Sequence, residues 1–147
     1  AVRAVLVASP GYLDRAGRPE TPDDLARHTL VTSSAVTFGN NWRFSMSGGV
    51  RAVRIEPRLR VTSNDAAITA ACEDFGITRV LSYQVADRVA DGRLAYVLAD
   101  YEAPKIPVHI VHQEGRNSSV RVRAFIDLLA ERLRAHKQTL RTRSAVN

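Results

Sequence analysis

The segment from residue 59 to residue 81 constrains the fold more than any other part of the sequence. Leu59 and Val61 alternate with polar residues, which is the two-residue period of a strand with one buried face. Ser63 or Asn64 can then cap a helix, because their short polar side chains accept hydrogen bonds from its first N–H groups. The pattern therefore predicts a strand that leads directly into a helix.

One face of this helix is apolar, and its members lie at positions i, i+3, i+4 and i+7. They are Ile68, Ala71, Cys72 and Phe75. Gly76 stands where a left-handed residue commonly ends a helix, and Ile77–Leu81 resumes as a strand. Such a unit closes by a right-handed crossover onto a parallel sheet, and its helix N-terminus lies at the edge where a ligand would bind. The fold class predicted is α/β.

Composition narrows the class of protein. The 147 residues are 45% hydrophobic and 24% charged, as in soluble globular proteins. No apolar run approaches the roughly 20 residues of a membrane span, and Ala1–Ala8 lacks the pattern of a signal peptide, so no membrane partner is expected. The single cysteine, Cys72, excludes an intrachain disulfide and fits a reducing compartment. We expect a cytoplasmic protein.

The net charge of +6 comes from one region, residues 116–143, which carries eight cations and two acids. The remaining chain has thirteen charges of each sign and is neutral. A basic helix of this kind can contact nucleic acid. It can also be a solvated helix face, and this interpretation is favoured because a single aromatic residue, Phe125, lies among the arginines.

Several other elements follow from local signals. Residues 2–8 alternate as a strand, and Ser9-Pro10 and Thr21-Pro22 each read as the cap and first residue of a helix, the first of which ends at Gly17. The remaining expected elements are strands at residues 29–32, 93–98 and 108–112, a β-hairpin at 42–55, a helix from Ser82 to Val89 and a long helix from 117 to 136.

Signatures of catalysis are absent. His109 and His112 are three apart on an expected strand, so they point to opposite faces and make a poor metal site. The adjacent carboxylates at 23–24 and 73–74 lie at helix ends, where solvation explains them. No phosphate-binding loop and no glycine-flanked nucleophile is found, so the chain is predicted not to be an enzyme and to need no cofactor.

Several short motifs along the chain stand in an order and spacing that are typical of one protein family. These are residues 8–13, 17–19, 21–25, 28–30, 42–44, 63–65, 70–71, 76–78, 92–94, 97–98 and 123–129. With them, the chain resembles the effector-binding domain of LysR-type transcriptional regulators over about residues 5–135. The resemblance implies a fold like that of the type 2 periplasmic binding proteins, in which two α/β lobes are joined by crossing strands and an effector binds in the cleft between them.

The resemblance also implies a division of the chain. It gives residues 1–8 as the first hinge strand, 9–76 as a complete second lobe, 77–81 as the second hinge strand, 82–136 as the C-terminal half of the first lobe, and 137–147 as a basic, disordered tail. The helix-turn-helix region, the linker helix and the first half of the first lobe have no counterpart in this chain. We therefore expect a fragment of a regulator whose DNA contact lies elsewhere.

The implied site lies on the second-lobe side of the cleft. Its candidate effector-binding residues are Thr32, Ser33, Ser34, Asn64, Asp65, Thr78, Arg79 and Val80. Hydroxyl groups, backbone N–H groups and a helix dipole favour an anionic group, so a small organic acid is the expected effector. An alternating strand could instead direct Arg79 toward solvent.

The predicted function is therefore the sensing of an effector by a LysR-type regulator. Two alternatives remain open: a stand-alone small-molecule binding protein, and a nucleic-acid contact through residues 116–143. The apolar stripe from Val122 to Leu133 is expected to pack on strands that this chain lacks. An exposed face of that size usually finds a partner, so another copy of the regulator, or a retained N-terminal piece, is expected to cover it.

Overall fold

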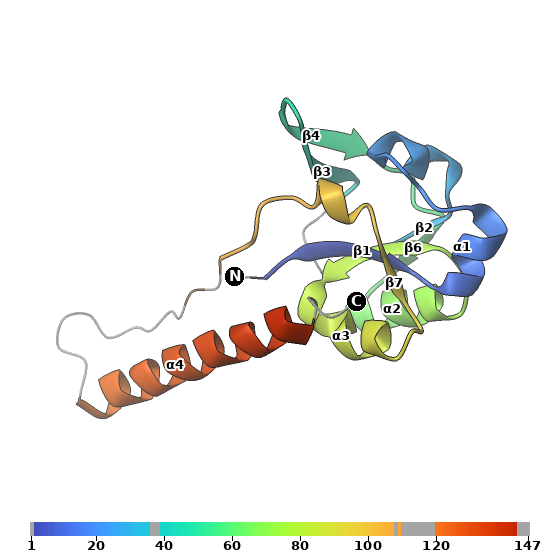
Figure 1. Cartoon of the computed structure of the whole chain (residues 1–147). Helices are drawn as coiled ribbons and strands as arrows, with labels where there is room; N and C mark the ends of the chain where they lie inside the picture. Colours follow the sequence, from blue (N-terminus) through green and yellow to red (C-terminus); the bar gives the residue numbers. More distant parts are fainter. Residues whose placement is uncertain (1, 36–38, 108, 110–119, 144–147) are drawn as a thin grey trace. The chain divides into compact units, whose positions relative to one another are not determined.

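The computed structural model describes residues 2–35, 39–107, 109 and 120–143, and of residues 134–143 only the backbone. The chain divides into two compact units, residues 1–107 and 108–147, which are described separately. The first unit is built on a five-stranded sheet with the strand order β5-β2-β6-β1-β7 (Figure 1). Its strands are β1 (Ala4–Ala8), β2 (Leu30–Ser33), β5 (Leu59–Val61), β6 (Ile77–Leu81) and β7 (Ala95–Val97).

The sheet is mixed. β5, β2 and β6 are mutually parallel, as the strand, helix and strand unit predicted. β1 runs antiparallel to both of its neighbours, with Val5 opposite Val80 and Leu6 opposite Val97. The predicted unit of strand, helix and strand is therefore present as β5, α2 and β6. β1, the first strand of the chain, lies beside β6.

Each face of the sheet has its own hydrophobic core, because successive strand residues point to opposite faces. Leu6, Ala8 and Ile77 pack on one side with aromatic residues, including Tyr12 and Trp42. The other core contains Val5, Val7, Val80, Ile68, Ala71, Val85 and Leu94. Two helices cover this second face, α2 (Asn64–Cys72) and α3 (Ser82–Ala90), which lie below the sheet in Figure 1.

The hairpin predicted at residues 42–55 is confirmed. It consists of β3 (Asn41–Met46) and β4 (Gly49–Arg54), which pair antiparallel. Trp42 and Phe44 point inward and are each only 1% exposed, whereas β4 is almost entirely exposed. The hairpin thus places two aromatic side chains over the face of the sheet that α2 and α3 leave uncovered.

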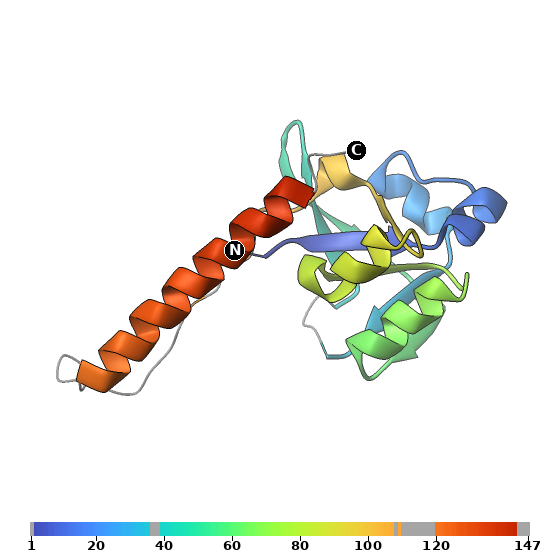
Figure 2. The same cartoon turned by 60° about the horizontal axis from the view of Figure 1, so that its bottom comes forward.

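Two short helices precede β2, and Figure 2 shows them together on one side of the unit. The first, α1 (Pro10–Ala16), starts and stops as predicted: the Ser9 hydroxyl accepts a hydrogen bond from the Tyr12 N–H at 3.2 Å, and Gly17 follows the last turn with a φ of 83°. The second, η1 (Pro22–Arg27), is a 3₁₀ helix.

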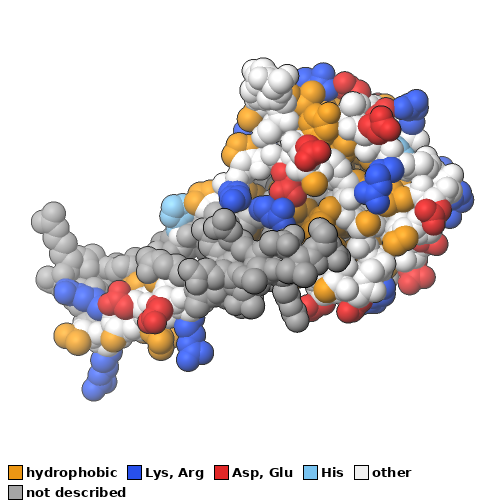
Figure 3. Space-filling model, in the orientation of Figure 1, with side chains coloured by type: hydrophobic (Ala, Val, Ile, Leu, Met, Phe, Trp, Pro, Cys, Tyr) orange, Lys and Arg blue, Asp and Glu red, His pale blue; other side chains and the backbone are white. Residues whose placement is uncertain are grey.

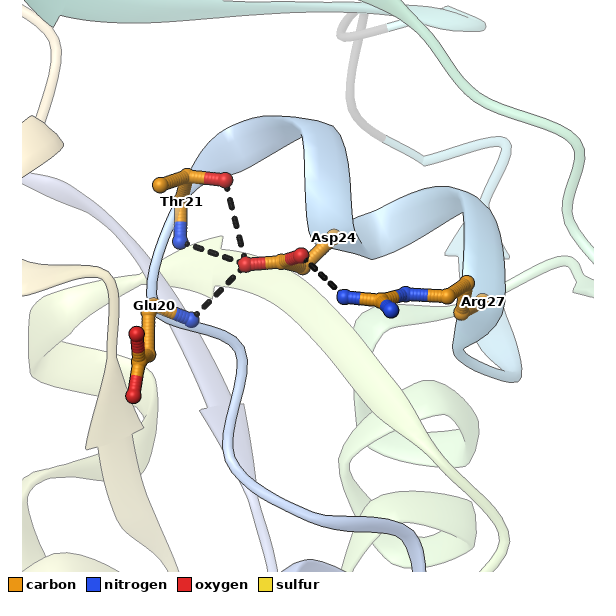
Figure 4. Close-up of polar contacts among 4 residues, drawn as sticks. All are labelled: Glu20, Thr21, Asp24 and Arg27. Carbon is orange, nitrogen blue, oxygen red and sulfur yellow. Dashed lines mark hydrogen bonds and ion pairs between the residues drawn. The ribbon is translucent and has the colours of Figure 1, made fainter.

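The start of η1 is organised by the carboxylate of Asp24 (Figure 4). It accepts hydrogen bonds from the backbone N–H groups of Thr21 at 2.8 Å and Glu20 at 3.1 Å, and from the Thr21 hydroxyl at 3.0 Å. Arg27 contacts its other oxygen. The hydrogen bonds from Thr21, and then that from Arg27, lower the pKa of Asp24 to about 2, so this cap is ionised at any ordinary pH.

The end of α2 differs from the prediction. Asp74, not Gly76, adopts the left-handed conformation, with a φ of 59°, and Phe75 is 41% exposed instead of joining the core. Aspartate tolerates this conformation better than most residues. Asp74 is also fixed by tertiary contacts, since the Ser9 hydroxyl donates to its carboxylate at 2.5 Å and Arg15 donates to its carbonyl at 2.7 Å.

The segment after β6 agrees with the predicted helix, which begins with Ser82 as its first residue instead of its cap. β7 and a 3₁₀ turn, η2 (Ala99–Tyr101), follow. Of the strand expected at residues 108–112, only His109 is described, and it is not in a strand; the other four residues lie outside the described part.

The second unit contains α4 (Val120–Arg143). The helix continues through residues 137–143, for which the sequence predicted a disordered tail. Lys137, Gln138 and Leu140 are good helix formers, and this propensity extends the helix after the apolar periodicity has ended. The predicted start at residues 117–119 lies outside the described residues. None of the helices in the described part is both long and apolar enough to cross a membrane.

Gly76 has a role in packing. A Cβ atom at this position would collide with the backbone carbonyl of Thr29, at the point where β6 begins beside β2. We expect Gly76→Ala to lower the free energy of unfolding by about 1–3 kcal/mol through overpacking, measured by urea denaturation. Gly48→Ala is the matched control, because nothing lies within 4 Å of its Cβ position. Equal stability of the two variants would contradict this account of the close approach.

The Tyr12 hydroxyl accepts a hydrogen bond from the Thr29 N–H at 2.9 Å and lies 3.0 Å from His28 Nδ1, to which it can donate its own proton. Nδ1 can accept this proton only when His28 is neutral. Burial lowers the pKa of His28, the negative charge of Asp24 raises it, and the positive charge of Arg27 lowers it further. The stabilisation is therefore complete above the ordinary value of 6.5 and is lost as the pH falls through the lower pKa of the folded protein.

Urea denaturation between neutral and mildly acidic pH should show this loss. The variant His28→Gln should be less sensitive to acid, because an amide oxygen also accepts from the tyrosine hydroxyl and does not titrate. The exposed His109 provides the control His109→Gln, which should retain the acid sensitivity. If the free energy of unfolding of the parent chain rose on acidification through this range, while that of His28→Gln did not, the assignment of a neutral His28 would be wrong.

Candidate functional site

The carboxyl ends of β5, β2 and β6 meet at one edge of the sheet, because these strands are parallel. A small open pocket lies there, whose volume of about 10 Å³ has room for about one water molecule. It is lined by Thr32, Ser33, Gly39, Trp42 and Arg79. Three of the eight residues predicted for the effector site are therefore brought together in one pocket.

Arg79 is the charged residue of this pocket. Its side chain is only 6% exposed, and its Nη2 donates a hydrogen bond to the backbone carbonyl of Arg43 at 3.1 Å. Its guanidinium carbon lies 5.7 Å from the centroid of the Phe44 ring and 6.0 Å from that of Trp42, within the range of cation–π attraction. The strand β6 thus presents a cation that the hairpin holds in position.

Burial lowers the pKa of Arg79 to about 10. The guanidinium remains protonated at neutral pH, so the pocket contains a full positive charge. Taking a charge out of water strengthens its interaction with any anion that reaches it, because the surrounding dielectric is low.

Two hydroxyl groups accompany this cation. Thr32 follows Val31, which pairs with Thr78, so Thr32 lies beside Arg79 on the neighbouring strand. The Ser33 hydroxyl oxygen accepts a hydrogen bond from the Ala35 N–H at 3.1 Å, an arrangement in which its own proton can be donated to a ligand. The pocket therefore offers donors to an anion.

Thr78 and Val80 lie on the opposite face of the sheet. The Thr78 hydroxyl donates to the Val31 carbonyl at 3.1 Å, and Val80 is completely buried in the core beneath α2 and α3. The two-residue period of the strand explains the separation, since Arg79 between them must point the other way. Both residues support the sheet and do not line the pocket.

The remaining predicted residues also lie outside the pocket lining. Ser34 is exposed, and its N–H donates to the Val61 carbonyl at 2.9 Å. Asp65 is exposed in the first turn of α2, a helix capped as predicted by Ser63, whose hydroxyl accepts from the Ala66 N–H at 3.1 Å. Neither Ser34 nor Asp65 therefore lines the pocket.

Asn64 connects α2 to α3. Its Nδ2 donates to Gln84 Oε1 at 3.2 Å, and the same oxygen accepts from the Leu81 N–H at 3.0 Å. The Asn64 Oδ1 is buried and has no hydrogen-bond partner among the described residues. The amide thus ties the start of one helix to the start of the next.

Sequence reasoning missed three features of the pocket: its tryptophan, the burial of Arg79 and its glycine. The signal for the first was present, because Trp42 and Phe44 alternate in the hairpin and an aromatic face requires a surface to cover. The possibility that Arg79 points to solvent was wrong, because the hairpin covers that face of the sheet. No sequence signal pointed to Gly39.

The pocket lining offers hydrogen-bond donors around a cation. Within the part of the chain that the structure describes, no three His, Cys, Asp or Glu side chains are grouped so as to hold a metal ion. On the face of the first unit seen in Figure 3, acidic and basic side chains are interspersed. Donor groups around a buried cation can orient an anion, and the pocket lining supplies no base or nucleophilic pair for catalysis.

Comparison with known proteins identifies the same family that the motifs suggested. A model of the LysR substrate binding domain matches residues 1–134. The HTH-type transcriptional regulator PtxR of Pseudomonas aeruginosa is 32% identical over 131 residues, which cover 88% of this chain and 41% of that protein. The uncharacterised HTH-type transcriptional regulator YhjC of Escherichia coli is 32% identical over 125 residues, which cover 84% of this chain and 42% of that protein.

Solved structures give the same result for the fold. The regulatory domain of AphB from Vibrio vulnificus superposes with a TM-score of 0.63 at 27% identity, over 70% of this chain and 51% of that one. The regulatory domain of CrgA, a LysR-type regulator from Neisseria meningitidis, gives 0.67 at 24% identity, over 88% and 64% of the two chains. The chain thus spans about two fifths of the curated relatives that it matches. They are transcriptional regulators, which agrees with the prediction of a chain that is not an enzyme.

Proposed function

The chain belongs to the LysR substrate binding domain family, and from this membership we propose that it senses a small-molecule effector for a DNA-binding transcriptional regulator. The match over residues 1–134 is the observation that carries the proposal. The regulators that it resembles are longer, so DNA contact is assigned to a helix-turn-helix region outside these residues. Such a regulator acts on the chromosome, and we place it in the cytoplasm.

The pairing of β1 with β6 supports the assignment of two hinge strands. In this proposal residues 1–8 and 77–81 are the crossing strands and residues 9–76 form one complete lobe. α3 and β7, which the division by sequence gave to the other lobe, share a sheet and hydrophobic cores with residues 9–76 and belong with them in the first unit. β1 and β6 lie side by side and antiparallel, and a chain that crosses between two lobes and returns requires this arrangement. The two strands are also buried on both faces, so each contacts both hydrophobic cores of the first unit.

The effector proposed is a small organic acid. Thr32, Ser33 and Arg79 supply hydroxyl and guanidinium donors within one pocket, and Asn64 and Asp65 begin α2 at the same edge of the sheet. Charge-assisted hydrogen bonds are among the stronger polar interactions, so an anionic ligand gains most from this donor set. An effector can shift the regulator between two arrangements only by its difference in affinity for them.

Binding should be visible as thermal stabilisation. A ligand at about 100 times its dissociation constant adds about 2.7 kcal/mol to the free energy of unfolding, which raises the melting temperature by several degrees. We expect carboxylates to produce this shift when a panel of aliphatic and aromatic acids and neutral metabolites is tested against the chain and against a longer regulator that contains it.

The panel separates the two parts of the proposal. Stabilisation by neutral compounds but not by carboxylates would show that the effector is not an acid. If no compound stabilised the longer regulator, while a melt of the same sample showed a cooperative transition, effector sensing itself would be contradicted.

The apolar residues of α4 generate a prediction about assembly. Phe125 is 65% exposed and Leu128 is 51% exposed, so the helix presents large hydrophobic side chains to solvent. We propose that a second copy of the chain, or a retained N-terminal piece of the regulator, covers them. Light scattering should therefore report a species heavier than 16.2 kDa, and Phe125→Glu should shift it toward that mass. A strictly monomeric parent chain with no co-purifying peptide would overturn this.

A further inference from the structure

The β3–β4 hairpin and the strand that follows it carry an excess of positive charge. Residues 39–60 contain five arginines and a single acid, Glu56, whereas the other residues before position 116 contain eight cations and twelve acids. The first segment therefore has a net charge of +4, and the remainder has one of −4. A surface that needs only to be soluble usually mixes charges of both signs, so this separation calls for another explanation.

Two of the arginines share the outer face of the hairpin. Arg43 lies between Trp42 and Phe44, which point inward, so its own side chain points outward. Arg54 lies opposite Asn41, two residues from Arg43 on the same face. Diagonal neighbours of this kind in an antiparallel ladder are about 7–8 Å apart. Two cations therefore lie side by side on this face.

Arg60 adds a third cation at the base of the hairpin, where its Nη1 donates a hydrogen bond to Asn40 Oδ1 at 3.1 Å. Arg43, Arg54 and Arg60 form an arginine cluster, and all three are exposed. Among the residues that the structure describes, none of the three has a carboxylate oxygen within 4 Å. The cluster thus presents three like charges to solvent, and an anionic partner would relieve their repulsion.

The position of the cluster suits a large partner. The hairpin projects from the sheet (Figure 1), and β4 is almost entirely exposed, so an extended molecule can reach its outer face. The planar fork of an arginine binds a phosphate group with two parallel hydrogen bonds. In the proposed function the chain is part of a DNA-binding regulator, so duplex DNA is the polyanion that is always close to it.

We infer that the arginine cluster binds the phosphate backbone of duplex DNA, as a contact separate from that of the helix-turn-helix region. The inference rests on the proposed function only in that the regulator binds DNA, and it does not involve the effector. Backbone contacts position a protein on a duplex without reading its bases. The cluster therefore holds the sensing domain on the DNA whatever the sequence beneath it.

The salt dependence of DNA binding measures such contacts. We would titrate a fluorescent duplex of about 25 base pairs with the chain and follow its anisotropy at several salt concentrations between about 50 and 200 mM. Each phosphate contact adds about 0.9 to the slope with which the logarithm of the binding constant falls against that of the salt concentration. We expect saturable binding, equal affinities for unrelated sequences and a slope that includes the three arginines.

Variants assign the slope to the cluster. Arg43→Gln, Arg54→Gln and Arg60→Gln each remove one charge and keep a polar side chain. Each should lower the slope by about 1 and weaken the binding of every duplex similarly, and the triple variant should lower the slope by about 3. Arg93→Gln is the matched control, because Arg93 is also exposed but follows α3, away from the hairpin, and it should leave the slope unchanged.

Urea denaturation of each variant shows that it is folded, which is expected because the three side chains are exposed. An unchanged slope in the triple variant, or no saturable binding of the parent chain at about 50 mM salt, would overturn the inference. If Arg121→Gln and Arg123→Gln lowered the slope and the triple variant did not, the contact would belong to residues 116–143, and the inference would again fail.

Poly-glutamate, labelled and titrated in the same way, tests the other kind of polyanion. If the chain bound poly-glutamate and not the duplex, and the triple variant removed that binding, the cluster would take an acidic polypeptide and the inference would be wrong. None of these outcomes depends on an effector, so effector sensing would stand if the inference failed. Conversely, a failure of every compound in the effector panel would leave the DNA titration unaffected.

Discussion

Strand β6 is hydrogen-bonded on both sides, antiparallel to β1 and parallel to β2, and both hydrophobic cores depend on it. Ile77 packs toward the aromatic residues of one core and Val80 packs beneath α2 and α3 in the other. A residue in the middle of such a strand is buried whatever its chemistry. The position of Arg79 therefore fixes a charge in the interior, and the Arg43 carbonyl and two aromatic rings offset part of the cost of removing it from water.

Most of the local structure could be predicted from short signals. The caps at Ser9 and Ser63, the proline that follows Ser9 and the alternation in the hairpin depend on residues only a few positions apart, and all of them are found in the structure. Gly76 was misassigned because its requirement is not local. The glycine is needed for the approach of Thr29, a residue far away in sequence, and no pattern within the helix reveals that contact.

The candidate site shows the same division. Parallel strand ends must meet at one edge, so the sequence predicted where a pocket could lie, and Thr32, Ser33 and Arg79 are found there. The sequence did not predict which face of β6 each residue would take. That choice depends on the register against β1 and β2, and a shift of one residue would exchange Arg79 with Thr78 and Val80. Tertiary pairing, not composition, decides that the pocket contains a cation.

The contacts of Arg79 also connect the pocket to the hairpin. The Arg79 guanidinium, which lines the pocket, donates a hydrogen bond to the Arg43 carbonyl of β3. It also lies near the rings of Trp42 and Phe44, the two sequence neighbours of Arg43. An anion that drew the guanidinium toward itself would weaken these contacts. Such an anion would act on β3 and β6 together, because the Arg79 side chain extends from β6 and contacts β3. On the proposed function, a strand that contacted the effector and also joined the two cores would need no separate element to transmit occupancy.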